Sequence, residues 1–229
     1  MISTRDLSEL PDVDGLRRLL KSLAMLDAIL CRDWQFRYYS FNSKWAKGER
    51  MGSMRDGSGN EFYALFNRHG CYLKGFHHES AMSPYRKGGD GKLWAGLIES
   101  VPSEFTEAVT EPAFSTKDTT FCIWRKQTDP AWQRGAIQFP PGHDPDGSAE
   151  LLAILDGRPE TYQAWAADGF EAPSLTVEQV RHIYEHRPLT PELVEAMRYD
   201  NPMASDAGSK VTLADLAEDV IEIGYPDAG

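Results

Sequence analysis

Leucines recur with helical spacing near the start of the chain. They fall at i, i+3, i+4, i+7, i+10 and i+14, at positions Leu16, Leu19, Leu20, Leu23, Leu26 and Leu30. The basic residues between them point outward. Asp12 or Asp14 can cap the start, because a side-chain oxygen there accepts a free backbone N–H. The spacing predicts an amphipathic helix over residues 14–31.

From Trp34 the hydrophobic period changes to two, which is typical of a strand. The segment WQFRYYSFNSKW is unusually aromatic, and alternation divides it between two faces. We expect one stripe, Trp34, Phe36 and Tyr38, to be buried against the first helix. The other stripe consists of Arg37, Tyr39 and Phe41, and these are the residues of the segment that could contact a partner.

More strands are predicted downstream. EFYALFN and CYLKGFH flank a short RHG connection, which is typical of a β-hairpin. TTFCIWRK at 119–126 and AIQF at 136–139 add two strands around a turn with Asp-Pro and Gly. The sheet-forming region therefore covers residues 34–139 and is mostly antiparallel.

Beyond Pro140 the pattern becomes helical, over residues 147–229. Thr176 with Gln179 and Thr212 with Asp215 resemble capping boxes. Residues 199–211 form the best candidate for a loop or linker. Strands followed by helices predict an α+β fold, with an N-terminal amphipathic helix packed on a mostly antiparallel sheet and a helical C-terminal region, in one domain over residues 1–229.

The net charge of −11 is unevenly placed. Residues 1–100 carry 15 Lys and Arg against 12 Asp and Glu, whereas residues 101–229 carry 9 against 23. An acidic second half opposes phosphate binding, so we expect no nucleic-acid partner. A solvated acidic surface that keeps the protein soluble explains the charge better than a specific basic partner, which is the other interpretation. No apolar run approaches the roughly 20 residues that span a bilayer. The start, MISTRDLSELPD, lacks a basic segment leading into an apolar one, so we expect a cytoplasmic location without membrane attachment.

Cysteine usage and glycine motifs suggest no cofactor. The three cysteines have no CxxC spacing and are expected to be buried thiols rather than disulfides or zinc ligands, at Cys31, Cys71 and Cys122. The glycines of DGSG and GGDG lack the context of a phosphate loop, and no GxSxG elbow is present. We therefore predict neither a metal nor a cofactor.

The first functional hypothesis is a non-catalytic binding protein. Aromatic side chains supply large apolar contact area with polar handles, so the aromatic, mildly basic sheet region is the candidate surface for a protein partner or small ligand. Its candidate contact residues are Arg37, Tyr39, Phe41, Arg55, Lys74, His77 and Glu79.

The alternative is a metal-assisted or acid/base hydrolase-like enzyme centred on His77 and Glu79. In a strand these two side chains share a face, while His78 points to the other. Such chemistry requires the turn at 51–60 to fold over them in a deep pocket. A third hypothesis, a homo-oligomer that assembles through the aromatic face, leaves the oligomeric state open.

Two further motifs look like metal sites. HIYEH, from His182 to His186, fits the inverted zinc-protease pattern, but the apolar stripe of that helix lies opposite, so the histidines are expected to face water. HDPDGSAE resembles the start of a calcium loop, although a turn that caps the next helix explains Asp144 and Asp146 better.

Taken together, several segments resemble a family of uncharacterised bacterial proteins: WQFRYYSFNSKW, MRDGSGNEFYALF, KGFHHESAMSPY, DTTFCIWR, DPDGSAELLAILDG, HIYEHRPLT and the terminal EIGYP. The likeness covers most of the chain and implies one full-length unit, without functional residues that could be transferred. In its acidic α+β character the chain is also similar to immunity proteins, which neutralise toxins by binding them.

Overall fold

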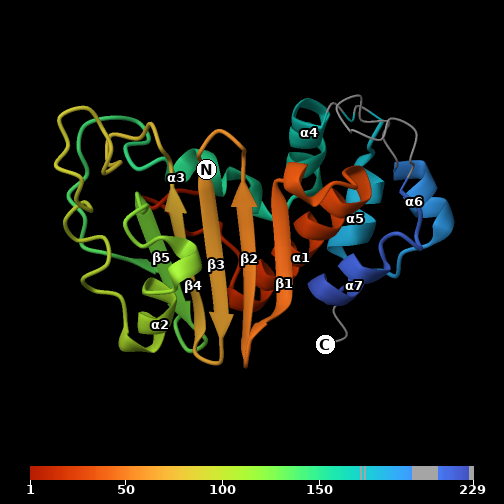
Figure 1. Cartoon of the computed structure of the whole chain (residues 1–229), viewed down its shortest axis with the longest axis horizontal. Coiled ribbons are helices and arrows are strands. Elements are labelled where there is room, and N and C mark those ends of the chain that lie inside the picture. Colours follow the sequence, from red (N-terminus) through yellow and green to blue (C-terminus); the bar gives the residue numbers. More distant parts are fainter. Residues whose placement is uncertain (171, 173, 198–210, 227–229) are drawn as a thin grey trace.

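The computed structural model describes residues 1–170, 172, 174–197 and 211–226, and they form the predicted α+β fold (Figure 1). An N-terminal helix is followed by an antiparallel sheet and then by further helices. The strands are β1 (Tyr39–Ala46), β2 (Glu49–Arg55), β3 (Glu61–Asn67), β4 (Gly70–Phe76), β5 (Phe121–Lys126) and β6 (Gln133–Arg134). The helices are α1 (Val13–Leu30), α2 (Thr106–Val109), α3 (Ser148–Leu152), α4 (Pro159–Gly169), α5 (Val177–Tyr184), α6 (Pro191–Met197) and α7 (Ala217–Ile223).

Helix α1 begins where the sequence predicts. Asp12 is the N-cap, and its Oδ1 accepts a hydrogen bond from the backbone N–H of Gly15 at 2.8 Å. The leucine stripe is buried against β1 and the C-terminal helices, so the predicted bounds of 14–31 are confirmed to within one residue at each end.

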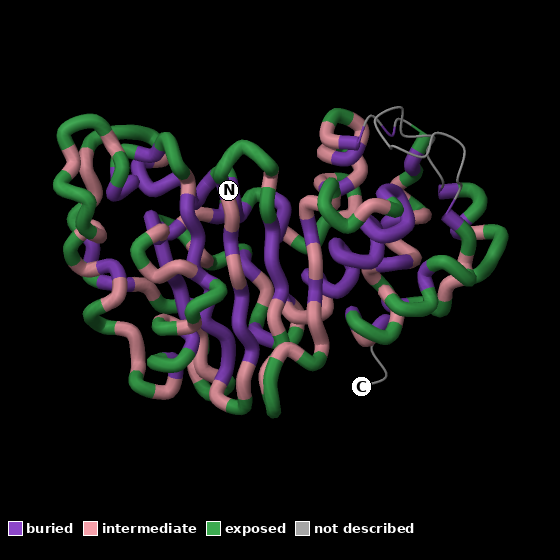
Figure 2. Tube along the Cα trace, in the orientation of Figure 1, coloured by how far each residue is buried: buried purple, intermediate pink, exposed green. Residues whose placement is uncertain are grey.

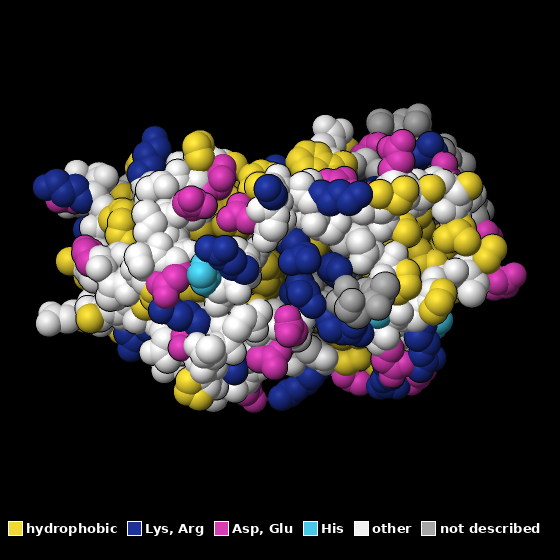
Figure 3. All heavy atoms as spheres, turned by 90° about the horizontal axis from the view of Figure 1, so that it is seen from below, with side chains coloured by type: hydrophobic (Ala, Val, Ile, Leu, Met, Phe, Trp, Pro, Cys, Tyr) yellow, Lys and Arg dark blue, Asp and Glu magenta, His cyan; other side chains and the backbone are white. Residues whose placement is uncertain are grey.

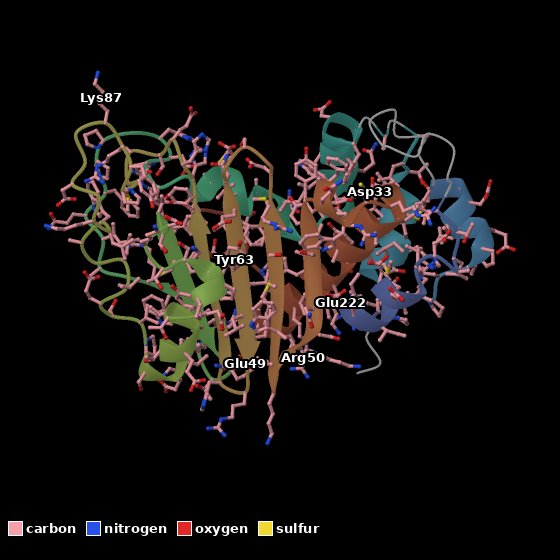
Figure 4. All side chains as sticks on the ribbon, viewed as in Figure 1. Asp33, Glu49, Arg50, Tyr63, Lys87 and Glu222 are labelled. Carbon is pink, nitrogen blue, oxygen red and sulfur yellow. The ribbon has the colours of Figure 1, made fainter. Side chains whose placement is uncertain are left out.

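The six strands follow one another in chain order as an antiparallel meander. Alternation gives the sheet two faces. Tyr39, Met54 and Phe62 are in register and face the main core, which we call the helix face because α1 packs on it. Tyr63 and Lys74 pair on the opposite face, where α2 lies in front of the sheet (Figures 1 and 4). Figure 2 shows that the strands are buried along much of their length and the turns are exposed.

The expected burial of the first aromatic stripe is wrong for Trp34 and Phe36, whereas Tyr38 is half-buried and packs against the main core. Strand β1 begins at Tyr39, and residues Trp34–Phe36 form a short 3₁₀ turn, η1, between α1 and the sheet. Trp34 is 54% exposed and Phe36 is 51% exposed. Tyr39 and Phe41, expected as contact residues, are instead buried in the main core. The period of two holds only from Tyr39 onward, and it turns these two rings toward α1.

The predicted strand at 136–139 is also wrong. The last strand, β6, is Gln133–Arg134, and the alternating apolar residues beyond it pack into a small loop cluster instead. Ile137 contacts Met82 and Leu97 there. Alternation in this segment therefore reflects packing of two loops rather than ladder hydrogen bonds.

Of the two capping boxes predicted in the C-terminal region, one stands at the start of a helix and the other does not. Thr176 and Gln179 form a capping box at the start of α5, as predicted. Thr212 and Asp215 exchange the corresponding hydrogen bonds, but α7 begins only at Ala217. Of the predicted linker at 199–211, residues 199–210 lie outside the described residues. Within the described parts of the chain, no helix combines the length and apolar character needed to cross a bilayer.

Candidate functional site

Lys74 is buried rather than exposed on the sheet. Its Nζ donates to the backbone carbonyls of Phe114, Ser115 and Asp118, at 3.3 Å for Ser115 and 2.6 Å for Asp118. Burial lowers the pKa of Lys74 to about 8, against the opposing effect of Glu61. Beside it Tyr63, labelled in Figure 4, stacks on Phe114 with ring centroids 4.9 Å apart. Lys74 therefore fastens the loop that follows α2 onto the sheet.

Arg37 also has a structural role. Its guanidinium donates to both carboxylate oxygens of Asp219 on α7, at 2.5 and 3.2 Å, and to the carbonyls of Cys31 and Arg32. The Arg37 side chain is only 8% exposed. It therefore links the end of α1 to α7 and presents little surface to a partner.

Arg55 remains on the surface and pairs with an aromatic ring. Its guanidinium lies over the Trp34 indole, 4.5 Å from the ring centroid, which is cation–π geometry. Arg55 and Trp34 are both exposed. Arg55 is therefore one predicted contact residue that a partner can reach, and Trp34, which was expected to be buried, joins it on the surface.

His77 and Glu79 do not converge. Strand β4 ends at Phe76, so the alternation that would align their side chains has already stopped. His77 Nε2 lies 3.1 Å from Glu150 Oε2 on α3, and since a carboxylate only accepts, Nε2 is the donor. The other ring nitrogen, Nδ1, is buried without a hydrogen-bond partner. The Glu79 side chain is 78% exposed and approaches His78 at 3.8 Å.

The two histidines of the HIYEH motif are held by different groups of the protein. Helix α5 ends at Tyr184, and His186 follows it with a φ of 55°. His186 is buried rather than facing water as expected, and its Nε2 lies 3.1 Å from Ser22 Oγ. His182 Nε2 lies 2.9 Å from the carbonyl of Pro188. No group of three or more His, Cys, Asp or Glu within the described residues is arranged to hold a metal ion.

The calcium-like DPDG segment is a capping turn, as predicted. Asp144 accepts from the backbone N–H groups of Ala149 and Glu150 at the start of α3. Asp146 accepts from Ser148 and from the Thr4 hydroxyl, which attaches the N-terminal segment to this turn. These contacts fix α3 beside the end of the sheet.

A pocket of about 360 Å³ opens at the end of the sheet where β1 and β3 begin and β2 and β4 end, the top in Figure 1. We call it the upper pocket. Strands β1 and β2 supply one side, and α3, the turn after it and α4 supply the other. Its lining residues are Tyr38, Tyr39, Met54, Asp56, Glu150, Leu151, Ala153, Ile154, Thr161 and Trp165. Neither His77 nor Glu79 is among them, but Glu150 connects His77 to the rim.

The aromatic wall of the upper pocket is held rigidly. Tyr38 meets Trp165 edge to face, with ring centroids 4.9 Å apart. Trp165 also contacts the rings of Tyr39, Tyr162 and Phe170 at 5.3, 5.3 and 5.5 Å. Such mutual packing leaves these side chains little rotamer freedom, so the wall is formed before any ligand arrives.

The buried carboxyl group of Asp27 holds together the elements that lie beneath the upper pocket. Asp27 of α1 is fully buried, and its Oδ2 accepts from the backbone N–H groups of Tyr38 and Tyr39, each at 2.8 Å. Its Oδ1 accepts from the Tyr162 hydroxyl at 2.7 Å. Burial raises the pKa of Asp27 to about 7, despite these hydrogen bonds and the nearby Arg37. Asp27 thus joins α1, the start of β1 and α4 beneath the pocket.

The rim of the upper pocket is acidic. Asp56 accepts four hydrogen bonds from Ser58 and Asn60 within its own turn. Burial acts to raise the pKa of Asp56, but these hydrogen bonds outweigh it and hold the pKa below its usual value. Asp56 is therefore a fixed negative charge. Glu150 is exposed, and among the described residues no hydrogen bond reaches its Oε1.

A larger pocket at the opposite end of the sheet has a different character. It is lined by charges of both signs, including Lys47, Glu49, Arg68, Glu104 and Glu107. Figure 3 views this end and shows basic and acidic side chains interspersed. Glu104 pairs with Lys126 at 2.6 Å, and the lining carries charges of both signs rather than of one sign.

Sequence reasoning missed Glu150 and Trp165. Both come from helices more than ninety residues after β1, and no local motif marks either one. The excess of acidic residues after residue 100 was the available signal, because a basic partner is one interpretation of it. No family model, curated protein or solved structure matches the chain. The resemblance to an uncharacterised bacterial family stays a prediction.

Proposed function

We infer that this is a non-catalytic binding protein whose contact surface lies at the upper end of the sheet. The observation that supports this most is the upper pocket, a preformed aromatic concavity with acidic groups on its rim. Trp34 and Arg55 form an exposed cation–π pair at the same end of the sheet, although neither residue lines the pocket. This surface replaces the one predicted on the Tyr39 and Phe41 stripe, because those rings are buried.

The side chains around the pocket suit recognition better than proton transfer. Asp56 uses its carboxylate to hold its own turn, and the Thr161 hydroxyl is donated to Asp156 at 2.6 Å. His77 presents neither ring nitrogen, because one contacts Glu150 and the other is buried without a partner. A general acid or base needs an atom within hydrogen-bond reach of its substrate. The alternative enzyme centred on His77 and Glu79 therefore has less support.

A protein partner is favoured over a bulky cofactor. The pocket volume of about 360 Å³ is near the lower end of the range of roughly 300–1,000 Å³ for small-molecule sites, and it suits one inserted side chain. The pocket wall carries Tyr38 and Trp165, and Tyr and Trp are residue types that are enriched among the energetically important residues of protein interfaces. Immunity proteins, which act by binding a protein, are one class with this behaviour.

Site-specific photo-crosslinking tests this function. The photo-reactive residue p-benzoylphenylalanine replaces Ala153, at the mouth of the upper pocket, or Ala113, an exposed alanine near α2 that serves as the matched control. We expect one protein from the native host to crosslink from position 153 and not from position 113, and to bind the purified chain reversibly. Crosslinking that is equal at both positions, or confined to position 113, would contradict the proposed surface.

A further inference from the structure

The lining of the upper pocket is selective for positive charge. Two carboxylates, Asp56 and Glu150, stand at its rim, and its lining residues among those the structure describes include no Lys, Arg or His. The nearest basic residues in sequence are engaged elsewhere, since Arg55 lies over Trp34 and Arg37 is bound to Asp219. The two negative charges therefore act on whatever enters the pocket.

The aromatic wall adds to this selectivity. Tyr38 and Trp165 are both partly exposed and stand at right angles to each other, so a group in the pocket meets at least one ring face or edge. Cations bind over the face of Trp better than over any other ring, and a guanidinium also stacks on it because the guanidinium is planar. An anionic ligand would meet two carboxylates and the negative faces of these rings, and would be rejected.

Glu150 supplies directional contact as well as charge. Its Oε2 is held by His77 Nε2 at 3.1 Å, which fixes the carboxylate, while Oε1 remains available to accept. Asp56 has its oxygens occupied by its own turn and contributes a fixed charge instead. One free, oriented carboxylate oxygen together with a ring face matches a guanidinium, which donates in a plane and stacks on its flat side.

We propose that the upper pocket binds a guanidinium group, presented as an arginine side chain on the surface of a partner protein. The proposal rests on the proposed binding function and names the chemistry that the partner must carry. The four apolar residues of the floor, which are Tyr39, Met54, Leu151 and Ile154, would contact the methylene stem of that arginine. The acidic charge of the chain would steer a basic partner toward it.

The test uses small probes on the full chain, with binding followed by NMR shifts of the Trp165 indole N–H and of the Tyr38 and Glu150 amides. N-acetyl-L-arginine amide imitates an arginine within a protein, and N-acetyl-L-citrulline amide is its neutral isostere. We expect the arginine probe to bind saturably and at least tenfold more tightly than the citrulline probe. Equal binding of the two probes, or tighter binding of N-acetyl-L-lysine amide, would overturn the assignment to a guanidinium.

A charge-matched pair of variants locates the site. Glu150→Gln removes one charge from the rim but keeps an acceptor for His77, and Glu107→Gln removes one charge from exposed α2. Affinity for the arginine probe should fall at least fivefold in the first variant and stay unchanged in the second. Equal effects of the two substitutions would show that only overall charge matters, and would refute binding in this pocket.

Free L-arginine distinguishes a free amino acid from a protein side chain as the source of the guanidinium, because its charged ammonium and carboxylate are strongly hydrated and costly to bring to the pocket, unlike the neutral amides of the blocked probe. Free arginine should bind more weakly than the blocked probe, and tighter binding would overturn the assignment to a protein side chain. If the arginine probe fails while a partner still crosslinks from position 153, the guanidinium assignment is wrong and the binding function stands. If the probe binds but no partner crosslinks there, the protein-binding function fails instead.

Discussion

Replacing Asp27 by Asn should make the protein less sensitive to pH. Burial raises the pKa of this carboxyl group from its usual 3.8 to about 7, so between these values the folded chain holds a proton that the unfolded chain releases. The stability due to this proton is fully present below about pH 4 and is lost as the pH rises through about 7. Above that range the folded protein must hold a buried negative charge.

The magnitude follows from linkage. The whole displacement of the pKa corresponds to about 4 kcal/mol, at roughly 1.4 kcal/mol for each factor of ten in proton affinity. Between pH 5 and pH 8 the Asp27 contribution to the free energy of unfolding should fall by about 3 kcal/mol. Since a domain is stabilised by only about 5–15 kcal/mol, a change of this size is easily measured.

Asparagine imitates the protonated acid at this position. A neutral carboxyl would carry its proton on Oδ1 and donate to the Tyr162 oxygen, while Oδ2 still accepts from the N–H groups of Tyr38 and Tyr39. The Asn amide offers the same donor and the same acceptor. We therefore expect Asp27→Asn to fold normally and to gain stability relative to the native protein as the pH rises.

Urea unfolding at pH 5, 6, 7 and 8 measures this difference, followed by circular dichroism. The stability of the native protein minus that of Asp27→Asn should decrease by about 3 kcal/mol from pH 5 to pH 8. Asp168→Asn, which removes an exposed carboxylate from α4, serves as the control and should track the native protein throughout. A constant difference for Asp27→Asn would refute the reasoning, because Asp27 would then have the same pKa in the folded and unfolded chains.

Three further substitutions test the contacts around the sheet. Lys74→Met should destabilise the protein by about 2–3 kcal/mol in urea unfolding, because it leaves carbonyls of the loop after α2 without their donor; an unchanged midpoint would contradict the role of Lys74. Thr176→Ala should cost about 1 kcal/mol through loss of the capping box, whereas Thr128→Ala on an exposed turn should cost almost nothing. Gly147→Ala should lower the melting temperature far more than Gly157→Ala, since both have φ above +70° but only the Cβ at position 147 would meet His77, at 2.2 Å. Similar losses for the two glycines would show that the contact between Gly147 and His77 has no role in stability.

The elements that the sequence predicted correctly are those fixed by local chemistry. The first helix carries its own cap and its own apolar stripe, and the hairpin of β3 and β4 is fixed by alternation and a short turn. In both cases the residues that determine the element lie within or beside it. The capping box at Thr176 succeeded for the same reason.

The site could not be predicted because its parts come together only in the folded chain. Glu150 contacts His77 across 73 positions, and Tyr162 contacts Asp27 across 135. Glu79 looked like the partner of His77 because it is two residues away, but the end of β4 at Phe76 removes the alignment. Lys74 looked like a surface cation, and only the tertiary fold reveals the carbonyls that bury it.

One physical cause explains both why the burial predicted for the aromatic stripe is wrong and why the pocket forms. Strand β2 ends at Arg55, whose N–H donates to the Tyr38 carbonyl, so a strand that extended back to Trp34 would have no partner for its earlier backbone groups. Asp27 instead accepts the N–H groups of Tyr38 and Tyr39, and the preceding residues turn away from the sheet. This turn brings Trp34 to the surface beside Arg55 and leaves Tyr38 against Trp165. The hydrogen-bonding requirement of a few backbone groups thus decides which aromatic residues a partner can reach.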